Sequence, residues 1–170
     1  VASHPEEAQA FVAEVTKDPA VLAARFNAAL EQLKRDPHVD TTRLAAIGYC
    51  FGGGVVLGMA RAGAQLAAVV TFHGALATNS PAQPGNVKTR VLVLTGGADP
   101  FVPPEQVEAF KREMQAAGAR FEVISYAGAK HGFTNPDAGK YGMPQLAYDA
   151  AADRESWAAM LKLFKEIWPG

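Results

Sequence analysis

The sequence predicts an α/β fold with a doubly wound, mostly parallel sheet, and three observations support this prediction. Segments with strand-like and helix-like patterns alternate along the 170 residues. One of them, residues 66–72, is an unbroken apolar run, which is typical of parallel strands buried on both faces. A glycine-flanked turn at residues 47–54 joins a strand directly to a helix. The length fits one domain, so residues 1–170 are expected to form a single domain.

Two helices are expected before the first strand. Ser3 and Glu6 have the spacing of a capping box, and apolar residues then recur at helical spacing. Asp18 is expected to cap a second helix, which begins at Pro19. The residues expected on the buried face of this second helix are Val21, Leu22, Phe26, Leu30 and Leu33.

The remaining elements alternate between strand and helix. Strands are expected at residues 42–49, 66–72, 91–95 and 121–126. Helices are expected after the glycine-flanked turn to about residue 62, from 103 to 118, and close to the C-terminus. Glycine-containing loops follow the third and fourth strands, at residues 96–100 and 128–132, and a long loop is expected at 134–144.

The only cysteine, Cys50, occupies the tip of the glycine-flanked turn, with Gly48 and Gly52 two residues to either side. This is the pattern of a nucleophile elbow, a sharp strand-to-helix turn in which larger side chains at those two positions would collide. Free N–H groups and the helix dipole favour an anion there and lower the cysteine pKa. The backbone N–H of Phe51 is expected to face an acyl oxyanion. Cys50 is therefore predicted to be a nucleophile rather than a buried apolar residue.

Two further residues complete a predicted catalytic triad. Asp99 follows the third strand and His131 follows the fourth, and the carboxyl ends of parallel strands meet at one edge of the sheet. The chain order of nucleophile, acid and histidine is that of α/β-hydrolases. His131 is expected to take the thiol proton and give it to the leaving group, while Asp99 orients the imidazole. Taken singly, Asp99 would be a turn residue and His131 a solvated loop residue, but their shared placement favours the triad.

Two phenylalanines lie close to these positions in the sequence, and a further histidine ends a strand. Phe101 and Phe133 flank the acid and the histidine, and they are predicted to line an apolar substrate pocket, with simple packing as the alternative. His73 ends the second strand and is expected to have a structural role.

Composition argues against several classes of function. The formal net charge of −1 argues against a nucleic-acid partner. No apolar run approaches the ~18 residues that cross a membrane, and no signal-peptide pattern opens the sequence. A cytoplasmic location is expected because a reducing setting suits a reactive thiol. A single cysteine cannot form an intrachain disulfide or a cysteine-based zinc site. Leu57 stands where a dinucleotide-binding fingerprint needs glycine, so no such fingerprint is present.

The segments around the three candidate positions resemble the dienelactone hydrolase family of the α/β-hydrolase superfamily. The matching segments are residues 48–53 (GYCFGG), 97–103 (GADPFVP) and 130–133 (KHGF), and the similarity runs from about residue 19 to residue 168. This span corresponds to the C-terminal two-thirds of family members. The resemblance implies an α/β-hydrolase-like sheet without its N-terminal strands. It also implies hydrolysis of small esters or lactones through an acyl-cysteine intermediate, without metal or cofactor.

The sequence departs from the family pattern in two ways. Family members carry further strands upstream, with a second oxyanion donor and a glutamate that contacts the cysteine, and neither can be assigned on this chain. An upstream segment or a second chain is therefore expected to complete the sheet beside residues 42–49. Family members also place an arginine shortly after the histidine, where this sequence has Thr134, Asn135 and Pro136. Neutral esters are therefore expected to be preferred over carboxylated lactones.

Three alternatives stand beside the hydrolysis of an ester or lactone, for which the partner is a small-molecule substrate. The same triad could attack an activated phosphotriester, which presents a phosphorus centre to the same nucleophile. A non-catalytic α/β-hydrolase-like binding module is a second alternative, although such a module need not keep all three triad residues. A thiol redox sensor is a third, but the sequence offers no second cysteine for resolution.

Overall fold

The computed structural model describes residue 2 and residues 4–169. Internal contacts divide the chain into two units, Val1–Arg43 and Leu44–Gly170, which are described separately. The prediction of a single domain over residues 1–170 is not tested by this division and stays a prediction.

The first unit contains two helices, α1 (Pro5–Thr16) and α2 (Pro19–Lys34), as expected. The N-cap of α1 is His4, whose side chain accepts a hydrogen bond from the N–H of Glu7, and the predicted cap Ser3 lies outside the described residues. Asp18 caps α2 by accepting from the N–H of Ala20, as predicted. The prediction of a buried face on α2 is wrong, because none of its residues is buried. Among the described residues of this unit, the one other helix has 12 residues and cannot enclose the apolar stripe of a 16-residue helix.

The second unit is built on a four-stranded parallel sheet, which confirms the predicted fold class. Its strands are β1 (Ala45–Tyr49), β2 (Ala68–Phe72), β3 (Arg90–Gly96) and β4 (Phe121–Tyr126), and they lie in the order β1-β2-β3-β4. β1 begins three residues later than expected because Asp40 forms a turn. Its carboxylate accepts from both the N–H and the hydroxyl of Thr42, and its carbonyl accepts from the N–H of Arg43.

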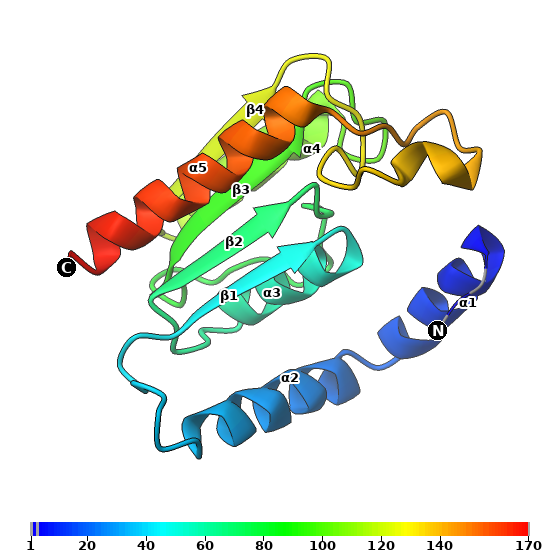
Figure 1. Cartoon of the computed structure of the whole chain (residues 1–170). Coiled ribbons are helices and arrows are strands. Elements are labelled where there is room, and N and C mark those ends of the chain that lie inside the picture. The colour runs from blue at the N-terminus through cyan, green and yellow to red at the C-terminus, as the bar shows by residue number, and fades with distance from the viewer. Residues whose placement is uncertain (1, 3, 170) are drawn as a thin grey trace. The chain divides into compact units, whose positions relative to one another are not determined.

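Helices cover both faces of this sheet, as a doubly wound fold requires (Figure 1). Helix α5 (Ala150–Ile167) lies on one face, while α3 (Phe51–Arg61) and α4 (Pro104–Ala116) lie on the other. The core under α5 consists of Ala68, Val70, Phe72, Leu92, Leu94, Met160 and Leu163. On the opposite face α3 packs against β1 and β2, and Phe110 of α4 contacts the ring of Phe121 edge-on.

The segment expected as a long loop at 134–144 contains a short 3₁₀ helix, η1 (Ala138–Tyr141). This segment and the residues just after it are tied to the loop that follows β4. His131 forms an isolated β-bridge with Leu146, and the Lys130 ammonium donates to the carbonyl of Pro144. These contacts fix the loop that follows β4.

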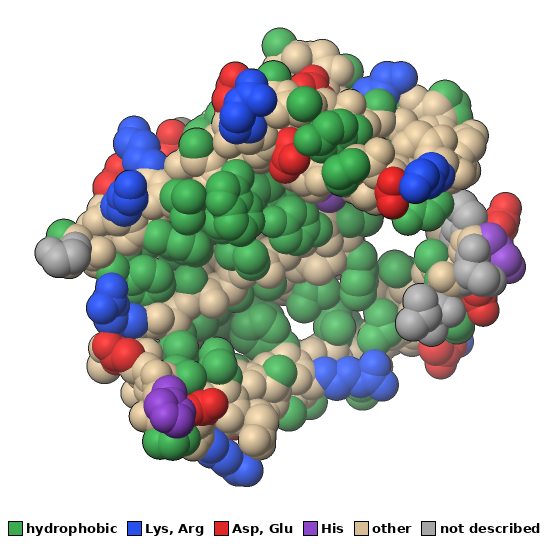
Figure 2. Space-filling view, in the orientation of Figure 1, with side chains coloured by type: hydrophobic (Ala, Val, Ile, Leu, Met, Phe, Trp, Pro, Cys, Tyr) green, Lys and Arg blue, Asp and Glu red, His purple; other side chains and the backbone are tan. Residues whose placement is uncertain are grey.

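An apolar surface lies on the α5 side of β1. Ile47 and Tyr49 of β1 and Trp157 and Leu161 of α5 are large apolar side chains that remain exposed. Figure 2 shows hydrophobic side chains gathered over the sheet beside α5. Within the described part of the chain, β1 hydrogen-bonds to β2 alone, so it has an open edge. Among the same residues, no helix combines the length and apolar character needed to span a membrane.

Candidate active site

Cys50 lies at the sharp turn between β1 and α3. Its backbone has φ 50° and ψ −120°, a conformation that costs energy for a residue with a side chain. The N–H of Cys50 donates to the carbonyl of Phe72 at 3.0 Å, which anchors the turn to the end of β2. The first turn of α3 then begins, with the N–H of Gly53 donating to the carbonyl of Cys50. The strained elbow predicted from the sequence is present.

The glycines of the elbow are needed for different reasons. A Cβ on Gly48 would lie 2.3 Å from the carbonyl oxygen of Gly52, so glycine is required there. A Cβ on Gly53 would lie 2.2 Å from the hydroxyl oxygen of Thr71, which packs directly under the turn. A Cβ on Gly52 would meet nothing within 4 Å. The expectation that Gly52 avoids a collision is therefore wrong, because a side chain there would extend into open space.

The structure brings the three predicted triad residues together. The Nε2 atom of His131 lies 3.1 Å from the sulfur of Cys50, and its Nδ1 atom lies 2.8 Å from Oδ2 of Asp99. The Asp99 carboxylate is fully enclosed, and its other oxygen accepts from the N–H of Phe101 at 2.8 Å. The side chain of His131 is 12% exposed, and Cys50 is open to solvent. Three loops from the same edge of the sheet therefore meet in one continuous line of polar contacts.

The electrostatics of this line favour a thiolate beside an imidazolium. The hydrogen bond from His131 lowers the pKa of Cys50 and outweighs the opposite effect of burial, with a smaller contribution from the backbone N–H of Phe51. Burial alone would lower the pKa of His131, but its bonds to Asp99 and Cys50 outweigh this and raise the pKa to about 9. Both shifts favour a negative sulfur beside a positive ring.

The aromatic residues near His131 occupy different environments. Phe101 is 47% exposed, and its ring meets His131 edge-on with centroids 5.1 Å apart, so it remains a candidate for contact with a substrate. Phe133 is fully buried and packs against Tyr126 and Ala129. The predicted pocket role of Phe133 is therefore not supported, because a side chain with no exposed surface cannot line a pocket in this conformation.

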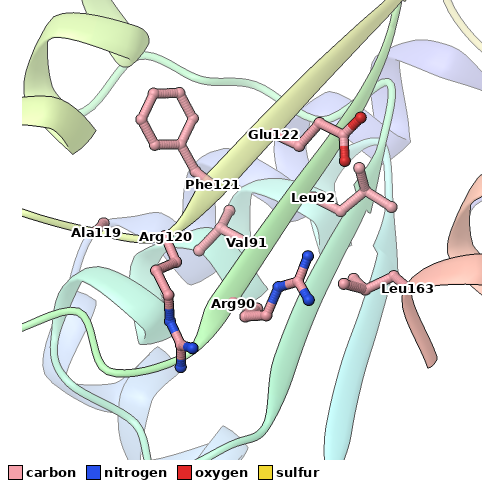
Figure 3. A pocket seen from close by; sticks show the side chains of 8 residues that line it. All are labelled: Arg90, Val91, Leu92, Ala119, Arg120, Phe121, Glu122 and Leu163. Atoms are coloured by element: carbon pink, nitrogen blue, oxygen red, sulfur yellow. The ribbon is translucent and has the colours of Figure 1, made fainter. Parts of the chain in front are cut away.

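A separate cavity lies far from the triad, at the amino ends of β3 and β4 (Figure 3). Its volume is about 530 Å³, and its lining is Arg90, Val91, Leu92, Ala119, Arg120, Phe121, Glu122 and Leu163. Parallel strands carry their ligand sites at the opposite, carboxyl ends, where Cys50 and His131 are found. Across the described residues, no cluster of three or more potential ligand side chains could hold a metal ion.

Comparison with known proteins agrees with the local geometry. The family model described as "Dienelactone hydrolase family" matches residues 1–168. The chain belongs to the dienelactone hydrolase family. Uncharacterized protein K02A2.1 of Caenorhabditis elegans is 38% identical over 150 residues, which cover 86% of this chain and 94% of that protein. A protein of Escherichia coli strain K12, provisionally named carboxymethylenebutenolidase, is 36% identical over 135 residues, covering 75% of this chain and 47% of that protein.

A solved structure extends the comparison. The crystal structure of a dienelactone hydrolase-like promiscuous phosphotriesterase from metagenomic libraries has a TM-score of 0.88 and 41% identity. The match covers 94% of this chain and 66% of that one. The chain thus spans about half the length of the E. coli relative and about two thirds of this structure.

His73, for which the sequence predicts a structural role, lies against the candidate base His131. His73, after β2, has its ring centroid 5.1 Å from that of His131. The available signal was positional, since His73 ends a strand at the same sheet edge as the triad.

Proposed function

We propose that the protein is a cysteine-dependent hydrolase of small esters or lactones that works through an acyl-cysteine intermediate. The observation that carries this proposal is the continuous contact from the exposed sulfur of Cys50 through His131 to the buried carboxylate of Asp99. The arrangement provides a nucleophile, a base and a group that orients the base.

The proposed reaction follows from the positions of these atoms. The Cys50 thiolate attacks the substrate carbonyl carbon, and the backbone N–H of Phe51 at the start of α3 stabilises the oxyanion that forms. As this intermediate collapses, the ester C–O bond breaks and His131 protonates the departing alkoxide. His131 then removes a proton from water, the resulting hydroxide attacks the thioester, and the acid leaves as Cys50 returns to the thiolate. Asp99 holds the imidazole and stabilises its charged form throughout.

The test is replacement of Cys50 in an assay with p-nitrophenyl acetate. Cys50→Ala is expected to abolish turnover without loss of folding, because it removes only the sulfur of an exposed side chain. Cys50→Ser is expected to keep a small fraction of activity, since His131 can still act as base. Intact-mass measurement during turnover should find one added acetyl group on the wild type and none on Cys50→Ala. Full activity of Cys50→Ala would refute the proposal, whereas a folded wild type without turnover would favour the binding module.

Within this chemistry we propose a preference for uncharged substrates. Thr134 and Asn135 follow the candidate base where the resembled enzymes carry an arginine, and the nearby Lys130 ammonium is held by the carbonyl of Pro144. A cation–carboxylate contact is about twice as strong as a neutral hydrogen bond, so an anionic substrate gains little here. The measurement is kcat/KM for a neutral ester against a lactone carboxylate of similar size. A higher value for the carboxylate would contradict this preference.

Hydrolysis of an activated phosphotriester is a second candidate function, and the likeness to the promiscuous phosphotriesterase favours it. A thiolate at the tip of an elbow can attack phosphorus as well as carbonyl carbon, with His131 protonating the leaving group. A p-nitrophenyl phosphotriester assayed beside the ester tests this directly. Release of p-nitrophenol that depends on Cys50 would support it, and release at the same rate by Cys50→Ala would exclude it.

A further inference from the structure

His73 is a buried, strained residue that the proposed reaction does not use. It lies at the end of β2 with φ 41°, a conformation that few residues other than glycine adopt, and it is 4% exposed. Its N–H donates to the carbonyl of Leu94 at 2.8 Å, which holds the strained backbone against β3. A strained polar residue in a core requires compensating contacts.

The contacts of the His73 side chain lead to the loop that carries His131. Its Nε2 atom lies 2.9 Å from the hydroxyl oxygen of Thr134, three residues after the candidate base. Its ring makes edge-to-face contacts with the rings of His131 and Phe133, with centroids 5.1 Å and 5.2 Å apart, respectively. His73 therefore touches this loop at three of four consecutive positions.

The chemistry of the His73 ring indicates one neutral form. Its Nδ1 atom is buried and has no hydrogen-bond partner among the described residues. Because an unpaired buried N–H is costly, the proton is expected on Nε2, which then donates to Thr134. Burial, followed by the positive charge of His131, lowers the pKa of His73 to about 4, and the charge of Asp99 opposes this only in part. Tyr49 also faces the ring, at 6.0 Å between centroids.

We propose that His73 is a positioning residue for His131. As a neutral donor it fixes the loop through Thr134, and its ring limits the rotation of the neighbouring imidazole, so that Nε2 of His131 stays within reach of Cys50. The inference rests on the proposed role of His131 as the base. A neutral ring is required at this place, because a cation would repel the imidazolium form of His131.

The test removes the His73–Thr134 bond from each end in the whole protein. His73→Phe keeps an aromatic ring without the donor, and Thr134→Val replaces the acceptor hydroxyl with a methyl group of similar size. Thr89→Val is the matched control, since its buried hydroxyl has no hydrogen-bond partner among the described residues and lies at the opposite end of β3. His73→Gln retains a donor and should recover part of any loss.

Two readouts separate positioning from a merely structural role. The rate of iodoacetamide labelling of Cys50 is measured against pH, and kcat and KM are measured with p-nitrophenyl acetate. Both single variants should move the labelling midpoint to higher pH and lower kcat by roughly tenfold, with KM within about twofold, since a neutral hydrogen bond is worth about that factor. The double variant should be no worse than the stronger single variant, because both act through one bond.

The outcomes are distinct. An unchanged labelling profile and unchanged kcat in folded His73→Phe or Thr134→Val would overturn the inference, as would an equal effect of Thr89→Val. If His73→Phe does not fold, Thr134→Val alone decides, because Thr134 is only partly buried. Labelling of Cys50 does not require turnover. The proposed function can therefore fail, by full activity of Cys50→Ala, while the labelling profile still reports on His73.

Discussion

Replacing Gly48 with alanine is expected to disable the turn that presents Cys50. The new Cβ would lie 2.3 Å from the carbonyl oxygen of Gly52 and 2.7 Å from the nitrogen of Gly53. These are backbone atoms, so no side chain can rotate away, and the two segments must separate by about 0.7 Å to reach 3.0 Å. Overpacking of this kind costs about 1–3 kcal/mol. A displacement approaching 1 Å at a catalytic group costs about 100-fold in rate.

Gly52→Ala is the matched control, because it adds the same methyl group to the same elbow where nothing lies within 4 Å. Gly52 lies in α3, where alanine is favoured over glycine by about 0.5–1 kcal/mol. The melting temperature of Gly48→Ala should therefore be about 2–12 °C below that of the wild type, and that of Gly52→Ala should be unchanged or slightly higher. Ester turnover by Gly48→Ala should fall about 100-fold. Equal melting temperatures for the two variants would refute the steric argument.

Three further predictions concern pH, a buried ion pair and the sheet edge. Ester turnover should show a bell-shaped dependence on pH, because the active pair needs both the thiolate of Cys50 and the imidazolium of His131. The pKa of Cys50 is lowered from the usual cysteine value, and the imidazolium is lost as pH rises through about 9. An alkaline limb near pH 6.5 would contradict this. Arg61→Met should lower the free energy of unfolding by about 3–5 kcal/mol, since it leaves the largely enclosed Glu113 without its cation. Lys111→Met, which breaks the exposed pair with Glu108, should cost less than about 1 kcal/mol. Urea denaturation of the two variants measures both values. The chain of residues 1–170 should self-associate through the uncharged open edge of β1, and light scattering would detect this. A monomer that is fully active and folds cooperatively would show the prediction to be wrong.

The order of elements could be predicted from the sequence because local pattern decides it. Unbroken apolar runs flanked by glycine identified the buried strands, and the rule that parallel strands carry sites at their carboxyl ends brought Cys50, Asp99 and His131 to one edge. The start of β1 was misplaced because the turn at Asp40 depends on a side chain that accepts two hydrogen bonds from Thr42.

The remaining details depend on three-dimensional neighbours that the sequence does not specify. Phe133 and Phe101 have equivalent sequence contexts, yet one is enclosed by the core beside Tyr126 and the other is half exposed. The different needs for Gly48 and Gly52 arise from the direction in which each Cβ would point across the turn. The hydrogen bond between His73 and Thr134, 61 residues away, depends on the register of β2 against β3 and of β3 against β4. No local sequence pattern encodes these registers.

The separation of the triad along the chain makes the reactivity of Cys50 a reporter of folding. The sulfur and its imidazole partner are 81 residues apart, and β2 and β3 lie between their strands in the sheet. A partly folded chain that has formed β1 and α3 but has not yet docked β4 would carry a thiol without its imidazolium, which labels slowly at neutral pH. Contacts between residues this far apart in sequence form slowly, because the long intervening chain must first be brought together. A pulse of a thiol reagent during refolding would therefore time the arrival of β4 without any added probe.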